Sequence, residues 1–315
     1  MVRIQRILCP IDFSDFSRHA FDRALAIARS HDAKVTALHV VPIALATPVL
    51  PYVEPASLGP FETPPGERAR IFENLHRFLE PDHTLGDLVA LETTAAHDVP
   101  REILAQSNRL PADLIVMGTH GRSGVERLML GSVTEKILRK ARPPVLTVPA
   151  AAPADALTAA RPFARILCAL DFSDCAMTAF RYARALAEES RASLALLHAI
   201  ELAPPAYDPL IGPPIDLPGY RRACETTVRE RLRNVIPAAA RTSLDIEEIV
   251  VSGKPHHEIL RVATEWRADL VVLGMHGRNV LDRVLFGSTV EPVVRRAHCP
   301  VLTVRADAIA ASEAA

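Results

Sequence analysis

The chain contains the same sequence pattern twice, and this repeat limits the folds that it can adopt. The segment RILCPIDFSD at 6–15 returns as RILCALDFSD at 165–174, at an offset of 159 residues. The segment ADLIVMGTHGR at 112–122 returns as ADLVVLGMHGR at 268–278. A repeat of this length indicates two domains of one fold, which agrees with a chain of 315 residues.

The ends of the two copies predict the domain boundaries. We expect a first domain at 1–149, a linker at 150–162, a second domain at 163–305 and a tail at 306–315. The linker is rich in alanine and proline and lacks the apolar periodicity of a helix.

Short apolar runs alternate with helical patterns inside each copy. In the first copy five runs read as strands, at 4–10, 34–40, 87–93, 112–117 and 144–148. These runs are continuously apolar, as is typical of parallel strands that are covered on both faces. The segments between them carry apolar stripes at helical spacing. The alternation predicts an α/β fold: two Rossmann-like domains, each a five-stranded parallel sheet with helices on both faces.

A proline-rich stretch interrupts the alternation in each copy, at 42–65 and at 204–218. Proline cannot continue a helix interior or an inner strand, so both stretches are expected to be long loops that leave the second strand.

Composition excludes some classes of partner and compartment. The formal net charge is −1, which gives no sign of binding to nucleic acid or to a membrane surface. The five cysteines form no C-x-x-C pair, which favours a reducing compartment with buried thiols, Cys9 and Cys168 among them. With neither a signal peptide nor a membrane span expected, we predict a cytoplasmic protein.

The most informative motif is a glycine skeleton that both copies share. It consists of two glycines three residues apart, a gap of nine residues and a Gly-Ser pair: Gly118, Gly121, Gly131 and Ser132, then Gly274, Gly277, Gly287 and Ser288. The first glycine ends the fourth strand, and the Gly-Ser pair begins a helix. Ser132 with Glu135, and Ser288 with Glu291, have the spacing of a capping box.

This placement favours phosphate binding. Open α/β sheets bind ligands at the carboxyl ends of their strands, and a helix N-terminus attracts anions. Glycine lets a phosphate approach the backbone closely. The alternative is that the glycines only permit turns and the serines only cap helices. Neither a P-loop nor a dinucleotide-binding fingerprint is present.

An aspartate follows the first strand in each copy, Asp12 and Asp171. A carboxylate could accept a hydrogen bond from a base or ribose donor, or hold a divalent cation that bridges phosphates. The alternative is a role in capping the next helix.

Together these segments resemble the universal stress protein family. The resemblance rests on CPIDFSDFSRHAFDRALAIA, ALHV, ADLIVMGTHGRSG and GSVTEKILRKARPPVLTV, and it covers both halves of the chain. The glycine motif is similar to that of the ATP-binding branch of the family. The resemblance therefore implies an ATP-binding stress-response protein built as a tandem repeat.

The resemblance also implies the residues that contact ATP. In the first half they are Pro10, Asp12, Val40, Met117, Gly118, Gly121, Gly131, Ser132, Val133 and Thr134. In the second half they are Asp171, Ala199, Leu273, Gly274, Gly277, Gly287, Ser288, Thr289 and Val290. The second half departs from the pattern where Thr134 becomes Val290 and where Pro292 enters the helix, so weaker binding is expected there.

No catalytic residue is predicted, because His120 and His276 have no nucleophile at a suitable spacing. The favoured hypothesis is a binding and signalling module, and the alternative is a slow ATP hydrolase or another nucleotide-dependent enzyme. The intact glycines disfavour a scaffold that binds no nucleotide. Mg²⁺ or Mn²⁺ would accompany the nucleotide near Asp12 and Asp171. We expect the halves to form an intramolecular pseudo-dimer through their final strands, and two chains to form a homodimer.

Overall fold

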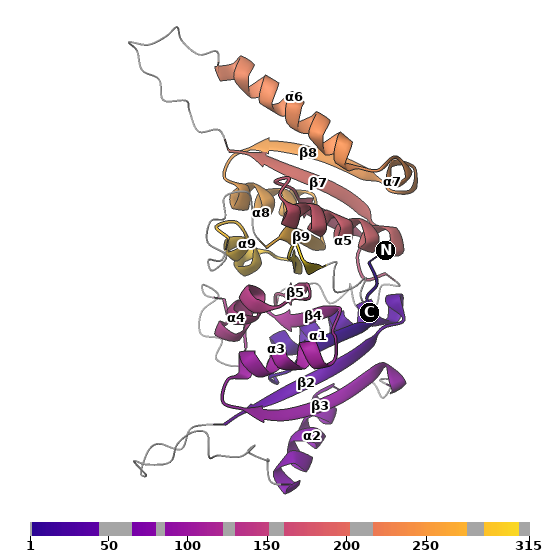
Figure 1. Cartoon of the computed structure of the whole chain (residues 1–315), viewed down its shortest axis with the longest axis vertical. Coiled ribbons are helices and arrows are strands. Elements are labelled where there is room, and N and C mark those ends of the chain that lie inside the picture. Colours follow the sequence, from indigo (N-terminus) through magenta and orange to yellow (C-terminus); the bar gives the residue numbers. More distant parts are fainter. Residues whose placement is uncertain are drawn as a thin grey trace, which may run out of the picture. The chain divides into compact units, whose positions relative to one another are not determined.

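A computed structural model of the chain describes residues 2–43, 65–79, 86–121, 130–150, 161–201, 217–275 and 287–308. The chain separates into two compact units, formed mainly by Arg3–Thr158 and by Ala159–Ala314. Both proline-rich stretches lie largely outside the described residues, as does most of the predicted linker. Figure 1 shows the helices and strands of both units.

The N-terminal unit is an α/β domain with a parallel sheet. Its elements are β1 Arg6–Pro10, α1 Asp15–His31, β2 Lys34–Pro42, α2 Pro65–Leu79, η2 Gly86–Leu88, β3 Val89–Ala96, α3 Val99–Arg109, β4 Leu114–Gly118, α4 Ser132–Lys140 and β5 Val145–Val148. The strands are ordered β3-β2-β1-β4-β5, and every pair is parallel. The predicted five-stranded parallel sheet is therefore confirmed.

The C-terminal unit repeats this topology. Its elements are β6 Arg165–Ala169, α5 Asp174–Ser190, β7 Ser193–Ile200, α6 Leu217–Val235, α7 Ala238–Ser243, β8 Ile246–Ser252, α8 Pro255–Glu265, β9 Leu270–Gly274, α9 Val290–Arg296 and β10 Val301–Val304. The order is β8-β7-β6-β9-β10, again with parallel pairs. The short helix α7 stands where the first unit has η2.

The strand order places helices on both faces of each sheet. From β1 the chain moves outward to β2 and β3, and it then returns to β4 and β5 on the other side of β1. Right-handed crossovers in opposite directions put their helices on opposite faces. Accordingly α1 packs against α2, and α3 packs against α4.

The strands form the centre of each core, as their apolar sequences predict. All five residues of β4 are buried, and all four residues of β5 are buried. Cys9 and Cys168 in the first strands are fully buried, which confirms their role in packing. Burial raises the pKa of both thiols well above the usual range for cysteine, because the thiolate would lose its hydration.

A partly buried aspartate joins the start of the fourth strand of each unit to the first strand. The carboxylate of Asp113 accepts hydrogen bonds from the N–H groups of Gln5 and Arg6, both at 2.9 Å. Asp269 does the same for Ala164 at 2.7 Å and Arg165 at 3.0 Å. The repeated Ala-Asp-Leu sequence therefore sets the amino-terminal edge of the sheet, away from the glycine motif.

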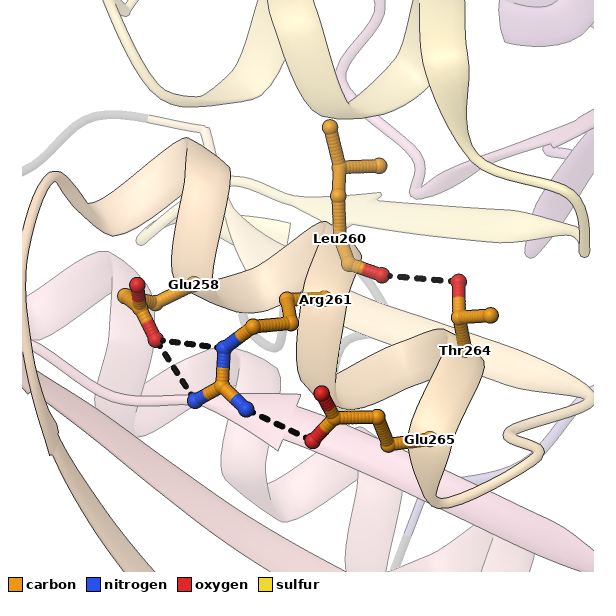
Figure 2. A network of polar contacts seen from close by, with 5 residues as sticks. All are labelled: Glu258, Leu260, Arg261, Thr264 and Glu265. Carbon is orange, nitrogen blue, oxygen red and sulfur yellow. Dashed lines mark hydrogen bonds and ion pairs between the residues drawn. The ribbon is translucent and has the colours of Figure 1, made fainter.

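Polar side chains on the surface of α8 form a local network (Figure 2). The guanidinium of Arg261 donates to Glu258 at 2.7 Å and to Glu265 at 2.6 Å, and Thr264 donates to the Leu260 carbonyl. Ion pairs one helical turn apart stabilise a surface helix by only a few tenths of a kcal/mol, about 0.3–0.5 kcal/mol each. This network therefore supports α8 locally.

Candidate functional site

The turn after β1 is held by its own side chains. The Oδ1 atom of Asp12 accepts hydrogen bonds from the Ser14 hydroxyl at 2.6 Å and from the Ser14 N–H at 3.1 Å. Ser14 is the N-cap of α1, and its Oγ accepts from the Ser17 N–H at 3.2 Å. The cap is therefore Ser14, and Asp12 orients it. Asp171 and Ser173 form the same pair of bonds in the C-terminal unit.

Phe13 gives this turn an unusual backbone conformation. Its φ of 64° lies in the left-handed region, which disfavours side chains other than glycine. The Phe13 ring packs on His39 of β2 with a centroid distance of 4.6 Å and on Phe78 of α2 at 5.4 Å. His39 Nδ1 lies 2.7 Å from the Ile11 carbonyl oxygen. These contacts hold Phe13 in place despite the strain.

The C-terminal unit has the same arrangement with one different partner. Phe172 has a φ of 63° and packs on His198 at 5.0 Å. The guanidinium of Arg231 on α6 lies 4.1 Å from the Phe172 ring centroid, whereas Phe78 covers Phe13 in the N-terminal unit. His39 and His198 stand at the same 159-residue offset as the first repeated segment, which is the signal that the sequence offers for these two residues.

The first motif glycine is needed for packing of a helix against a strand. A methyl group on Gly118 would lie 2.7 Å from Phe16 Cβ and 3.0 Å from the Phe16 carbonyl carbon. On Gly274 it would lie 2.6 Å from the Ala176 nitrogen. The missing Cβ therefore lets α1 and α5 approach the fourth strands, a reason that differs from the close approach of a phosphate.

The second motif glycine brings the two strand ends together. A Cβ on Gly121 would overlap the Oδ2 atom of Asp12, so the backbone after β4 passes directly beside the turn after β1. Strands β1 and β4 are neighbours in the sheet, with Ile7 opposite Leu114. They flank the point where the strand order reverses, which is where open α/β sheets bind ligands.

The capping-box prediction is wrong in both units. Gly131 is the N-cap of α4 and makes no side-chain capping bond, so Ser132 is the first helical residue. Glu135 instead pairs with Arg139, with 2.6 Å between Oε1 and Nη2. In α9 the N-cap is Thr289, again without a side-chain capping bond. The Ser-x-x-Glu spacing does not fix the position of the N-cap. Relative to the predicted serine, the N-cap lies one residue earlier in α4 and one residue later in α9.

The start of α4 is tied to the end of β4 by two hydrogen bonds. The Gly131 N–H donates to the Thr119 carbonyl at 3.0 Å. The Thr134 hydroxyl, which is buried, donates to the Gly118 carbonyl at 2.9 Å. Thr134 therefore lies at the site, and its hydroxyl is engaged by the protein itself.

The fold gathers most of the predicted residues at the carboxyl edge of each sheet. In the N-terminal unit, Pro10 ends β1, Asp12 follows it, Val40 lies in β2, Met117 and Gly118 end β4, and Gly131–Thr134 begin α4. In the C-terminal unit the corresponding residues are Asp171, Ala199, Leu273, Gly274, Gly287, Ser288, Thr289 and Val290. Gly277 lies outside the described residues, as does most of the nine-residue gap of each motif.

The described residues contain neither a metal-binding cluster nor a helix that could span a membrane. Within the described parts of the chain, no group of three or more His, Cys, Asp and Glu side chains is arranged to hold a metal ion. None of the described helices has the length and apolarity that a membrane crossing requires.

Two Rossmann-like α/β units of the same strand order, with Gly118 and Gly274 at the ends of their fourth strands, define a tandem protein of the Rossmann-like fold class. The sequence model of the universal stress protein family matches residues 3–149 and 162–305. The chain therefore belongs to the universal stress protein family, with two copies of the family domain.

Individual relatives agree with this assignment. A universal stress protein of Mycobacterium tuberculosis is 25% identical over 285 residues, covering 88% of this chain and 89% of that protein. The crystal structure of a universal stress protein from Archaeoglobus fulgidus, 21% identical, covers 96% of this chain and 98% of its own with a TM-score of 0.63, which shows the shared fold. A universal stress protein solved in complex with cAMP is 28% identical, covering 46% of this chain and 98% of its own with a TM-score of 0.33.

Proposed function

We propose that this universal stress protein binds ATP at the carboxyl edge of its N-terminal sheet and acts as a nucleotide-dependent regulatory module. The observation that carries the proposal is the position of the α4 N-terminus. Gly131 is hydrogen-bonded to Thr119, directly after β4, and Gly121 in the same loop lies beside Asp12. Within the fold class, this is the edge where ligands bind.

The start of α4 supplies the donors for a phosphate group. The first backbone bond of this nine-residue helix runs from the Glu135 N–H to the Gly131 carbonyl at 2.8 Å. The N–H groups of Ser132, Val133 and Thr134 precede it, and such groups have no partner inside a helix. Together with the partial positive charge of the helix N-terminus they suit an anion. Since Gly131 carries no capping side chain, nothing of its own competes for these donors.

The adenosine part of the ligand fits the neighbouring strand ends. Pro10 and Asp12 lie after β1, and Val40 lies in β2 with only 6% of its surface exposed. An Asp12 carboxylate already oriented by Ser14 suits a hydroxyl or amino donor of a ribose or base. The resemblance of these positions to the ATP-binding branch of the family supports adenine rather than another base.

A divalent cation would come with the nucleotide. Mg²⁺ is commonly held by one or two carboxylates together with phosphates and water. Asp12 is the carboxylate of this site, and Asp171 is its counterpart in the C-terminal unit. The described residues hold no complete set of metal ligands, so the phosphates would supply most of them.

Calorimetry on the full chain tests the proposal. Titration with ATP, ADP, AMP, cAMP, adenosine and GTP, each with and without Mg²⁺, should give binding of ATP and little binding of GTP. Adenosine should bind more weakly than ATP because it cannot reach the α4 donors. Equal affinity for ATP and GTP, or no binding of any of them, would contradict the proposal.

A further inference from the structure

The two units differ in how the helix after the glycine motif is fixed to the sheet. In the N-terminal unit the last residues of β4 and the next loop residue offer two carbonyl groups, those of Gly118 and Thr119. The Thr134 hydroxyl bonds the first at 2.9 Å, and the Gly131 N–H bonds the second at 3.0 Å. Only 3% of the surface of Thr134 is exposed, so its hydroxyl faces the protein interior.

In the C-terminal unit both bonds are missing. Val290 replaces Thr134 and has no hydroxyl group, although it is equally buried, with 4% of its surface exposed. Among the described residues of this unit, neither Gly287 nor Val290 donates a hydrogen bond to Gly274 or Met275. A Cβ on Gly287 would lie 3.7 Å from a Val290 methyl carbon, so that methyl group stands beside the glycine as the Thr134 hydroxyl does in the other unit.

The missing bonds coincide with a different helix start. The helix α4 begins at Ser132, directly after Gly131, whose backbone is extended with φ −59° and ψ 135°. The helix α9 begins at Val290, and its N-cap Thr289 is already helical with φ −96° and ψ −43°. In motif register α9 therefore starts two residues later, and it has seven residues where α4 has nine.

The turn that leads into α9 removes a donor. The Val290 N–H donates to the Gly287 carbonyl at 3.0 Å, whereas in the N-terminal unit the first such bond comes from Glu135, one residue further along the motif. The Thr134 N–H therefore stays available to an anion, and the Val290 N–H does not. In the proposed site the free N–H groups donate hydrogen bonds to the phosphates. The C-terminal unit therefore offers one such group fewer.

We infer that Thr134 is a positioning residue for the phosphates: its hydroxyl anchors α4 to the end of β4, and its loss in Val290 makes the C-terminal unit the weaker phosphate site. This inference rests on the proposed function. It gives Thr134 an indirect role in place of the direct ATP contact that the resemblance implies, since its hydroxyl is buried and bonded to Gly118. It further assigns part of the difference between the units to this one pair of side chains of nearly equal size, beside the departure at Pro292.

A reciprocal exchange in the full chain tests the inference. The variants are Thr134→Val, Thr134→Ser and Val290→Thr. The matched control is Thr178→Val on α5. It removes a buried hydroxyl that donates a hydrogen bond to the Ala306 carbonyl at 3.4 Å. Calorimetry with ATP and with adenosine gives the affinities, and 8-azido-ATP photolabelling with peptide mapping shows which unit is labelled. Thermal unfolding reports stability.

Thr134→Val should weaken ATP binding about tenfold, the loss expected for one hydrogen bond, with less than about a threefold change for adenosine. Thr134→Ser should restore ATP affinity, and Val290→Thr should raise labelling of the C-terminal unit. Thr178→Val should lower the melting temperature without changing either affinity.

Two results would overturn the inference while leaving the proposed function intact. One is wild-type ATP affinity in Thr134→Val. The other is an equal loss of ATP and adenosine affinity that Thr134→Ser does not restore, which would indicate a general structural defect. Failure of the wild-type chain to bind ATP would overturn both.

Discussion

Gly118 at the end of β4 lies against Phe16 of α1 so closely that a methyl group on Gly118 would stand 2.7 Å from Phe16 Cβ. Neither group can yield easily, because the contact is with the first carbon of the side chain and with the backbone. A comparable contact recurs at Gly274, where a methyl group would lie 2.7 Å from the Cys175 carbonyl carbon and 2.6 Å from the Ala176 nitrogen. The glycine thus couples a strand end to a helix start, and the site depends on that packing.

We therefore expect Gly118→Ala to destabilise the N-terminal unit by about 1–3 kcal/mol, the usual cost of overpacking. Urea unfolding measures it. Gly66→Ala is the matched control, since a Cβ there meets nothing within 4 Å and should leave stability unchanged or slightly raised. Wild-type stability in Gly118→Ala would contradict the packing role.

At Gly131 a substitution should affect ATP binding and not the stability of the unit. A Cβ at Gly131 would lie 3.2 Å from the Thr119 carbonyl oxygen. A shift of a few tenths of an ångström would relieve this contact. A leucine there would cover the start of α4, so Gly131→Leu should weaken ATP binding at least about tenfold while the unit stays folded. Calorimetry and circular dichroism measure the two effects, with Gly66→Leu as the control. Unchanged ATP affinity in Gly131→Leu would show that the phosphates bind elsewhere.

Stability should depend on the buried thiols at alkaline pH. Burial raises the pKa of Cys9 and Cys168, with Asp22 adding to the effect at Cys9. A raised folded-state pKa stabilises the protein below the unfolded value of about 8.5, and this stability is lost as pH rises further. The free energy of unfolding should therefore fall by up to about 1.4 kcal/mol per pH unit for each thiol above that value.

Urea unfolding between pH 7 and pH 10 checks this expectation. The upper limit lies about 1.5 units above the pKa of a cysteine thiol in the unfolded chain. Comparison with a Cys9→Ala, Cys168→Ala double variant isolates the thiols from other titrating groups, and the variant should show the shallower slope. Equal slopes for both proteins would contradict it.

Much of the fold could be predicted from the sequence, because the strands are apolar on both faces and the helices between them are periodic. The β4 sequence LIVMG, for example, lacks the alternating polar residues of a surface strand, and all five of its residues are buried. Helix starts were harder to predict. The Ser132–Glu135 spacing fits a capping box, yet the Glu135 carboxylate is taken by Arg139 and Gly131 provides the cap.

Contacts within the site depend on tertiary placement and could not be read from local patterns. The left-handed Phe13 is held by His39 and Phe78, which come from other elements. The bond from the Thr134 hydroxyl to the Gly118 carbonyl spans sixteen residues of chain that include the undescribed part of the motif. The family resemblance predicts Thr134 as a site residue, and the geometry adds that its hydroxyl bonds the Gly118 carbonyl.

The final strands of the two units give a prediction about assembly. We expect β5 and β10 to face each other, with Val145, Leu146 and Val148 against Val301, Leu302 and Val304, because an open apolar edge strand would promote aggregation. We propose that the connection at 150–162 makes this pairing intramolecular and that two chains then associate as a homodimer. Hydrogen–deuterium exchange should show slow exchange in both strands at any protein concentration. Exchange within seconds in either strand would rule the pairing out.

The central claim, that this universal stress protein carries an adenine nucleotide, is tested most directly by mass spectrometry of the freshly purified full chain after denaturation. We predict release of ATP or its product ADP at a substantial fraction of one molecule per chain, with Gly131→Leu releasing far less. Absence of any adenine nucleotide, together with no binding of added ATP, would contradict the account.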